Sequence, residues 1–176
     1  WFVEALQRER PAAALAILSP VASGQDWPTR PIAYVVPFTP GGTTDVVGRT
    51  LAQNLQPMLG QPVVVENKPG AAGAVGAAFA AKAKPDGYTL FGGTISTHAI
   101  NAGLYKDLPY DPIKEFEQNT LVGFIPNALY VNAQIPVNSV QELIALLKKD
   151  PAMRTFASSG AGTSTHLAGE LFGDLI

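Results

Sequence analysis

Three short apolar runs alternate with two stretches of helical spacing in the first half of the chain. The runs are rich in β-branched and aromatic residues, and each leads into a turn, so they predict strands at 32–37, 62–66 and 88–92. Short connections between alternating strands and helices favour right-handed crossovers. We therefore expect an α/β fold in which these strands are neighbours in a mainly parallel sheet with flanking helices.

The two stretches between the strands differ in composition. The second is mostly alanine and glycine and predicts a helix near 72–83 that can pack closely against its neighbours. The first predicts a helix near 44–59 that stops at Gly60, because one of its faces carries Val47, Leu51, Leu55 and Met58.

The pattern changes after residue 110. Two runs at 121–125 and 128–131 are typical of strands, and Ser139 followed by Glu142 predicts a capped helix. A further short strand near 155 leads into small residues and then into a helix whose apolar face carries Leu167, Leu171 and Leu175. No strand follows this helix before Ile176, so we expect an incomplete second unit.

Composition excludes several classes of protein. The 176 residues are 47% hydrophobic and 15% charged, which suits one domain or one domain and part of a second. A net charge of −2 without a basic run argues against nucleic acid and anionic membrane surfaces as partners. The absence of cysteine from the sequence rules out a disulfide framework, a thiolate nucleophile and a cysteine zinc site.

The first 26 residues resemble a leader. Basic "LQRER" precedes the apolar "PAAALAILSPVA", and small residues follow, as in a secretory signal peptide with Val21 and Ser23 at the −3 and −1 cleavage positions. The apolar run is too short to span a bilayer, so we expect no membrane insertion of the mature domain. A disordered leader or a cloning remnant is the alternative.

A strand followed by glycines and a helix start occurs twice, at 35–50 and at 155–170, and the run at 88–92 also leads into glycine. Ligands of open α/β sheets bind at the carboxyl ends of strands, where helix N-termini favour anions. "GGTTDVVGRT" lacks the lysine and the spacing of a phosphate loop. We expect Gly41 and Gly42 to bring the backbone close to a bound group, so that a bulky residue at Gly42 would weaken binding.

Three segments carry a family resemblance: "WPTRPIAYVVPFTPGGTTDVVGRTLAQNLQPMLGQPVVVENKPGAAG", "AKAKPDGYTLFGGTISTHAINAGLYKDLPYDPIKEF" and "FASSGAGTSTHLAGELF". Together they resemble the substrate-binding proteins of tripartite tricarboxylate transporters, the Bug receptor family. The resemblance implies a type II-like periplasmic-binding-protein fold, with a first lobe at 27–124 and a truncated second lobe at 125–176. It also implies a periplasmic location and a small carboxylate ligand: a di- or tricarboxylate, an amino acid or an aromatic acid.

The same resemblance implies where the ligand lies. In the family, one carboxylate is typically held by backbone amides and by ordered waters that bridge to loops of the first lobe. The receptor then works with the membrane subunits of a transporter or with a sensor. Carried over position by position, the pattern gives these ligand-binding residues: Phe38, Gly41, Gly42, Thr43, Thr44, Asp45, Thr94, Ser96, Thr97, His98, Ser158, Ser159, Gly160, Gly162, Thr163 and Ser164.

Several of these residues have structural alternatives. Asp45 in a first helical turn is as well suited to capping as to contact with a ligand amine. His98 and His166 lack the partners that catalysis or a metal would need, so we expect them to fix loops and we expect neither a metal nor a cofactor. Tyr88 and Phe91 are expected in the core.

A small α/β enzyme acting on a carboxylated substrate is the alternative function. Ser158 and Ser159 lack the glycine pattern of a hydrolase nucleophile, which favours the receptor over the enzyme. We also expect the first lobe without a complete second lobe to bind carboxylates weakly, because one wall of the cleft would be missing.

Overall fold

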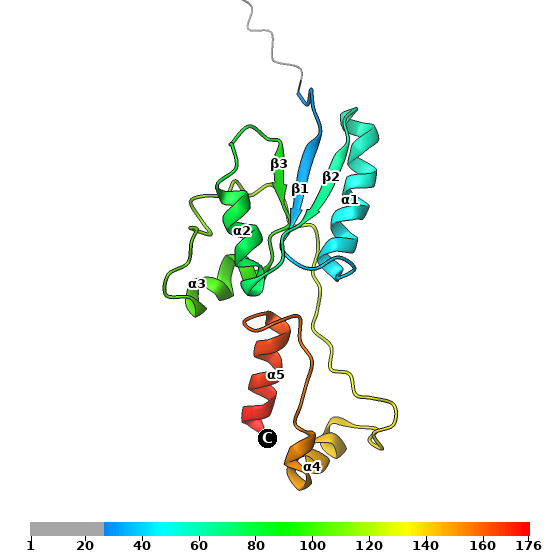
Figure 1. Ribbon diagram of the computed structural model, residues 1–176. Coiled ribbons are helices and arrows are strands. Elements are labelled where there is room, and N and C mark those ends of the chain that lie inside the picture. Colours follow the sequence, from blue (N-terminus) through cyan, green and yellow to red (C-terminus); the bar gives the residue numbers. More distant parts are fainter. Residues whose placement is uncertain (1–26) are drawn as a thin grey trace, which may run out of the picture.

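A three-stranded parallel sheet lies at the centre of the computed structural model, which describes residues 27–176 (Figure 1). The strands are β1 (Ile32–Val36), β2 (Val63–Asn67) and β3 (Thr89–Phe91), in the order β2-β1-β3. Both pairings are parallel. The prediction of three neighbouring parallel strands is confirmed, and β1 is the central strand.

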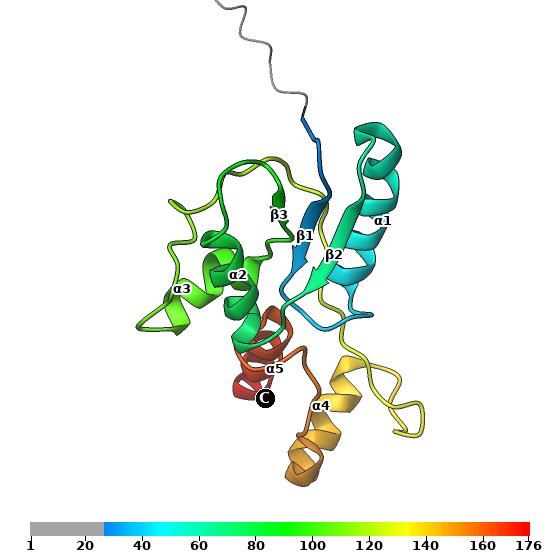
Figure 2. The same cartoon turned by 45° about the horizontal axis from the view of Figure 1, so that its top comes forward.

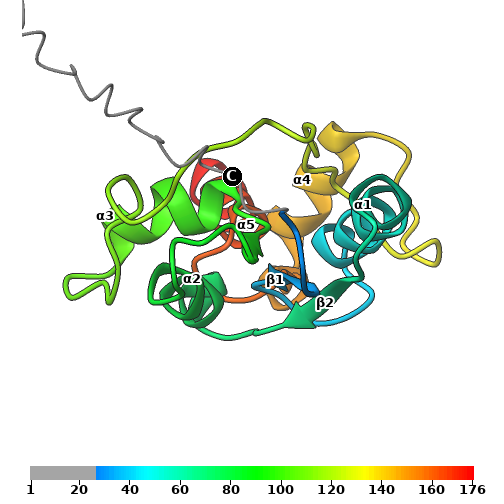
Figure 3. The same ribbon diagram turned by 90° about the horizontal axis from the view of Figure 1, so that it is seen from above.

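Two helices cover the sheet from opposite sides (Figures 1 and 3). Helix α1 (Thr43–Leu59) connects β1 to β2, and α2 (Ala74–Ala81) connects β2 to β3. Side chains alternate along a strand, so one set of β1 side chains faces α1 and the other set faces α2. Both crossovers were expected from the alternation of strand and helix patterns.

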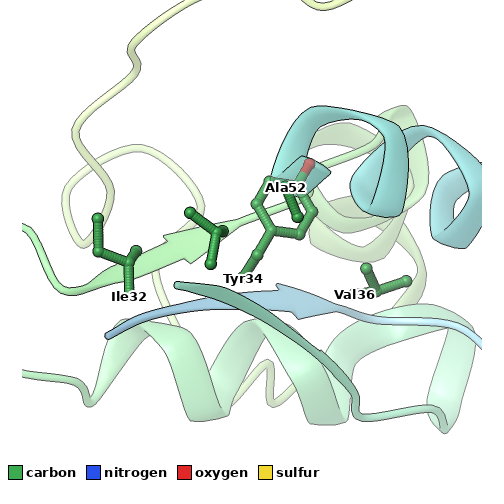
Figure 4. Packing of buried hydrophobic residues seen from close by; sticks show 5 residues of the cluster. Ile32, Tyr34, Val36 and Ala52 are labelled. Carbon is green, nitrogen blue, oxygen red and sulfur yellow. The ribbon is translucent and has the colours of Figure 1, made fainter. Parts of the chain in front are cut away.

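The core on the α1 side is built from β1, β2 and α1. Figure 4 shows Ile32, Tyr34 and Val36 of β1 facing Ala52 of α1, all of them buried. The apolar stripe of α1 continues through its leucines at intervals of four, and Met58 is 79% exposed. Met58 was therefore wrongly assigned to the buried face. The helix ends as predicted at Gly60, which has a left-handed φ of 66°.

The core on the α2 side depends on small residues. Ala74 and Ala77 are buried together with Tyr110, and partly buried aromatic side chains pack around them. A Cβ atom at Gly76 would lie 2.8 Å from the carbonyl oxygen of Lys68, so only glycine permits this approach of α2 to the sheet. The close packing predicted from the alanine and glycine content is present. However, the helix starts at Ala74, later than predicted, because left-handed residues precede it.

Short helices follow the sheet. A π-helix spans Ser96–Ile100 and continues into α3 (Asn101–Leu104). Further along are α4 (Val140–Lys149) and α5 (Ser164–Leu175). Short 3-10 helices span Ala71–Gly73 and Pro151–Met153. In Figures 1 and 2, α5 lies beyond the carboxyl ends of the three strands.

The strands predicted at 121–125 and 128–131 and near residue 155 are absent from the described part of the chain. These segments have no regular secondary structure, and Phe124 and Tyr130 are 88% and 86% exposed. A strand requires a neighbour for its backbone hydrogen bonds, and no strand of the described residues lies alongside these segments. Sequence pattern alone could not supply that neighbour.

The capped helix was predicted correctly. Ser139 precedes α4, and its Oγ accepts a hydrogen bond from the backbone N–H of Glu142 at 3.2 Å. The Glu142 carboxylate reaches back and accepts from the N–H of Asn138 at 2.7 Å. The two contacts satisfy N–H groups that would otherwise lack partners at the start of the helix.

The predicted signal peptide, with Val21 and Ser23 at its cleavage site, lies outside the described residues. Among residues 27–176, the structure contains no helix with the length and apolar character that a membrane span requires.

Candidate functional site

The strand order brings two loops together at the carboxyl edge of the sheet. After β1 the chain continues through α1 into β2, which pairs with one edge of β1. Strand β3 pairs with the other edge of β1. The loops after β1 and β3 therefore start beside each other and diverge, which is the usual ligand position in open α/β sheets. A Cβ at Gly92, directly after β3, would lie 3.5 Å from Cγ2 of Thr44 in the 38–45 loop. Two of the predicted loops thus meet.

The 38–45 loop ends at an uncapped helix N-terminus. Gly42 is the N-cap of α1, and no side chain caps it. The first-turn N–H groups have no helical acceptors, and Gly41, Gly42 and Thr43 are exposed. N–H groups without helical acceptors and the helix dipole together favour an anion at this end of α1.

Gly41, rather than Gly42, is the position where the backbone conformation requires glycine. Gly41 has a φ of +84°, a conformation that side chains disfavour. Gly42 has φ −73° and ψ 166°, and a Cβ there would meet only the Thr39 carbonyl at 3.5 Å, an ordinary contact. Backbone geometry therefore does not explain the expected sensitivity of Gly42.

Asp45 holds this loop in place from inside. Its side chain is 4% exposed, and it accepts hydrogen bonds at 2.9 Å from the N–H of Gly41, from Nε of Arg49 and from Nδ2 of Asn67. Arg49, the Gly41 amide and Asn67, in that order, hold the pKa of the Asp45 carboxyl well below its usual value. Asn67 also donates to the carbonyl of Phe38 at 3.0 Å. These contacts favour a structural role for Asp45, which ties Gly41 and Asn67 to the start of α1 without capping the helix.

The 94–98 turn is organised by Thr97, which is fully buried. Its Oγ1 lies 3.0 Å from both the N–H and the carbonyl oxygen of Thr94, and 2.9 Å from Nδ1 of His98. The His98 ring packs against both Phe91 and Phe116, with ring centroids 5.9 and 5.0 Å away. Burial lowers the pKa of the His98 imidazole, which favours a neutral ring. His98 fixes this turn, as expected.

The 158–164 loop is held by its own hydroxyl groups. Thr163 is the N-cap of α5, accepts from the N–H of His166 at 3.4 Å and donates to the Gly160 carbonyl at 2.7 Å. Ser158 Oγ accepts from the N–H of Gly160 at 3.2 Å. Ser164 Oγ lies 3.5 Å from Oδ1 of Asn127. Unlike α1, helix α5 thus has a side-chain cap.

A fourth segment, the 70–73 turn after β2, was not predicted as part of the site. Its four residues all have positive φ: Gly70 (132°), Ala71 (47°), Ala72 (51°) and Gly73 (87°). For each alanine this conformation costs about 1–2 kcal/mol. The alanines suggested a helix, but "KPGAAG" at the end of a strand carries the same proline–glycine signal as the 38–45 loop.

The 70–73 turn brings the other loops together. A Cβ at Gly73 would lie 2.7 Å from Cγ2 of Thr97 and 3.4 Å from Cζ of Phe38. A Cβ at Gly162 would lie 3.4 Å from Cβ of Ala72. The 38–45, 94–98 and 158–164 segments therefore all approach this turn, at the edge of the sheet that faces α5 (Figure 2).

Burial separates the predicted site residues into three groups. The exposed ones are Gly41, Gly42, Thr43, Ser158, Ser159 and Gly160. The half-buried ones are Phe38, Thr44, Thr94, His98 and Ser164. The buried ones are Asp45, Ser96, Thr97, Gly162 and Thr163. The first two groups can touch a solute directly, whereas the third can act through the loops that it holds.

Other features of the surface lie apart from these loops. Among residues 27–176, no three His, Cys, Asp or Glu side chains are grouped as a metal site would require. A hollow of about 680 Å³ lies beside α3, with Tyr105, Leu108 and Ile113 in its lining, and none of the predicted site residues borders it.

Comparison with known proteins identifies the family. The model of the TctC family, described as "Tripartite tricarboxylate transporter family receptor", matches residues 47–174. Protein BugT of Bordetella pertussis is 41% identical over 161 residues, which cover 91% of this chain and 49% of BugT. The chain thus spans about half the length of the curated relatives it matches.

Solved structures of related proteins are similar to this chain in sequence and in fold. The R. palustris protein Rpa4515, solved with adipate, is 40% identical with a TM-score of 0.79, over 83% of this chain and 49% of that one. The periplasmic binding protein BugD is 35% identical with a TM-score of 0.69, over 85% and 50% of the two chains. These likenesses confirm the periplasmic-binding-protein fold class. The chain belongs to the tripartite tricarboxylate transporter family of receptors.

Proposed function

We propose that this chain forms the ligand-binding first lobe and part of the second lobe of a periplasmic receptor for a small carboxylate. The observation that carries the proposal is the exposed, uncapped N-terminus of α1 beside the loop after β3. The adipate bound to the R. palustris relative supports a carboxylate as ligand. The lobes divide near residue 124, and the receptor's partners are the membrane subunits of its transporter.

The carboxylate is held mainly by backbone groups. The N–H groups of Gly42, Thr43 and Thr44 provide donors at the positive end of α1, and the two threonine hydroxyls add further donors. Small side chains leave room for waters between the ligand and the protein. From the second lobe, the exposed Ser158, Ser159 and Gly160 contribute to the opposite wall, together with residues held in place by Thr163.

The hydrogen bonds of the described residues favour a receptor over the alternative enzyme. A serine nucleophile needs a histidine within hydrogen-bond reach. His98 Nδ1 contacts Thr97, and His166 Nε2 lies 3.5 Å from Oε1 of Glu170. No serine is hydrogen-bonded to either imidazole in the part of the chain described here.

An NMR titration tests the proposal, because it detects weak as well as tight binding. Adipate is added to the ¹⁵N-labelled chain, with uncharged adipamide as the control of equal length. Adipate should shift the amide signals of Gly42, Thr43 and Thr44, since their N–H groups lie at the site, and adipamide should shift them much less.

Equal shifts with adipamide, or adipate shifts confined to other regions, would reject the anion site. Proton spectra of the added adipate provide the test of the enzyme alternative. The probe should remain unchanged throughout the titration, and its conversion into a product would favour the enzyme.

A further inference from the structure

A buried asparagine stands between two of the site's turns. Asn101, the first residue of α3, is 0% exposed. Its Nδ2 donates to the carbonyl of Ala72 at 3.2 Å and to the hydroxyl oxygen of Tyr110 at 3.3 Å. A carbonyl can only accept, so the nitrogen of the side-chain amide must face Ala72.

Tyr110 extends this hydrogen-bonded path from Asn101 to the 94–98 turn. Its hydroxyl donates to the carbonyl of Thr97 at 2.7 Å, and its side chain is buried. Burial raises the pKa of the Tyr110 phenol, which keeps the proton that this bond requires. The ring meets Phe116 edge to face, with centroids 6.0 Å apart, and this packing fixes its direction.

The two ends of this link are backbone carbonyls in different turns. Ala72 lies in the left-handed 70–73 turn, and Thr97 lies in the 94–98 turn. The path from Ala72 through Asn101 and Tyr110 to Thr97 lies in the protein interior, where hydrogen bonds are strengthened by the low dielectric.

Two features indicate how the Asn101 side chain acts. Left-handed alanines persist only where their surroundings hold them, and Asn101 is the side chain that bonds to the Ala72 carbonyl. In addition, Oδ1 of Asn101 is buried and has no hydrogen-bond partner among the described residues. The bonds from its Nδ2 to Ala72 and Tyr110 are therefore the hydrogen bonds by which the Asn101 side chain acts among these residues.

We propose that Asn101 and Tyr110 are positioning residues that lock the 70–73 turn to the 94–98 turn and so fix where Thr94 and His98 face the carboxylate. This inference rests on the proposed function of the site. Neither side chain touches the ligand. Both act through the backbone of the turns that they join.

Amide hydrogen exchange tests the link without any ligand. Tyr110→Phe removes the hydroxyl and keeps the ring, so exchange should accelerate about threefold to tenfold at both Gly73 and His98, whose N–H groups bond within the two turns. Tyr88→Phe is the matched control, because its hydroxyl bonds to Thr29 ahead of the sheet. Asn101→Ala should reproduce the acceleration at Gly73.

Affinity for adipate, measured by NMR titration of the full chain, tests the consequence. Tyr110→Phe should weaken binding about threefold to tenfold while Tyr88→Phe leaves it unchanged. Unchanged exchange at both turns in Tyr110→Phe, or unchanged affinity despite faster exchange, would overturn the inference. If the parent chain binds no adipate, the proposed function fails, and exchange at Gly73 and His98 still decides whether the two turns are linked.

Discussion

Replacing the two glycines of the 38–45 loop separately should give different results. Gly41 has a φ of +84° and nothing within 4 Å of a Cβ, so Gly41→Ala creates no clash and only forces alanine into a left-handed conformation. That conformation costs about 1–2 kcal/mol. Gly42 has a φ of −73°, which alanine adopts freely, and its Cβ would make one ordinary contact. Gly42→Ala should therefore be close to neutral, because the gain of about 0.4–1 kcal/mol from restricting the unfolded chain is offset by the poor suitability of alanine as an N-cap.

Urea denaturation, followed by circular dichroism, measures both effects as shifts in the transition midpoint at constant slope. Each variant serves as the control for the other, since the added methyl group is the same and the sites are adjacent. The pair also bears on the proposed site. Gly41→Ala should lower adipate affinity in the NMR titration. The left-handed strain would act on the residue whose N–H donates to Asp45 and orients the start of α1.

The opposite order of stabilities would refute this reasoning. If Gly42→Ala destabilises the chain as much as Gly41→Ala, the left-handed residue of the loop is not Gly41. The 38–45 loop would then approach the helix by a different path, and the expected arrangement of N–H donors would be lost with it.

Three further predictions concern single side chains. Asp45→Asn should destabilise the chain at pH 7. Denaturation at several pH values should show the difference in stability from wild type shrinking below about pH 4. A difference in stability that stays constant with pH would contradict the lowered pKa of this carboxyl. Gly76→Ala should lower the free energy of unfolding in urea by about 1–3 kcal/mol, because its Cβ would clash with the Lys68 carbonyl. At Gly103 a Cβ would have no neighbour within 4 Å, so Gly103→Ala should not destabilise the chain. Ser139→Ala should cost about 1 kcal/mol by removing the α4 cap, and an unchanged midpoint would show that the cap adds nothing.

The sheet could be predicted because its signals are local. β1 and β2 are runs of β-branched residues bounded by turns, and the intervening segment has the spacing of α1 and stops at Gly60. The crossover rule then fixes the parallel arrangement. Met58 was misplaced because one helical face can be drawn through either Met58 or Leu59, and only packing against the sheet decides between them.

The 70–73 turn could not be predicted in the same way. Ala71 and Ala72 favour a helix by propensity, but they are left-handed in a turn whose Ala72 carbonyl accepts a hydrogen bond from the distant Asn101 amide. Similarly, the segments around Phe124 and Tyr130 have the composition of strands but no neighbour to pair with. In each case the deciding contact involves residues far away in the sequence.

The candidate site was predicted partly from general rules and partly from resemblance. The position of the glycines at the carboxyl ends of strands indicated the 38–45 loop, and a carboxylate in the first helical turn indicated a structural role for Asp45. The buried hydroxyl of Thr97 and the link through Asn101 had no local signal, since both depend on how the chain after β3 folds back.

The central place of β1 has a consequence for how the chain assembles. Ala33 pairs with Val64 on one side and with Thr89 on the other, so the β1–α1–β2 unit can form from a shorter length of chain than the full sheet. During synthesis, β1 and β2 are therefore complete while one edge of β1 still lacks its neighbour. An unpaired strand edge can pair with strands of other chains, and this edge of β1 stays unpaired until β3 has been synthesised and has docked.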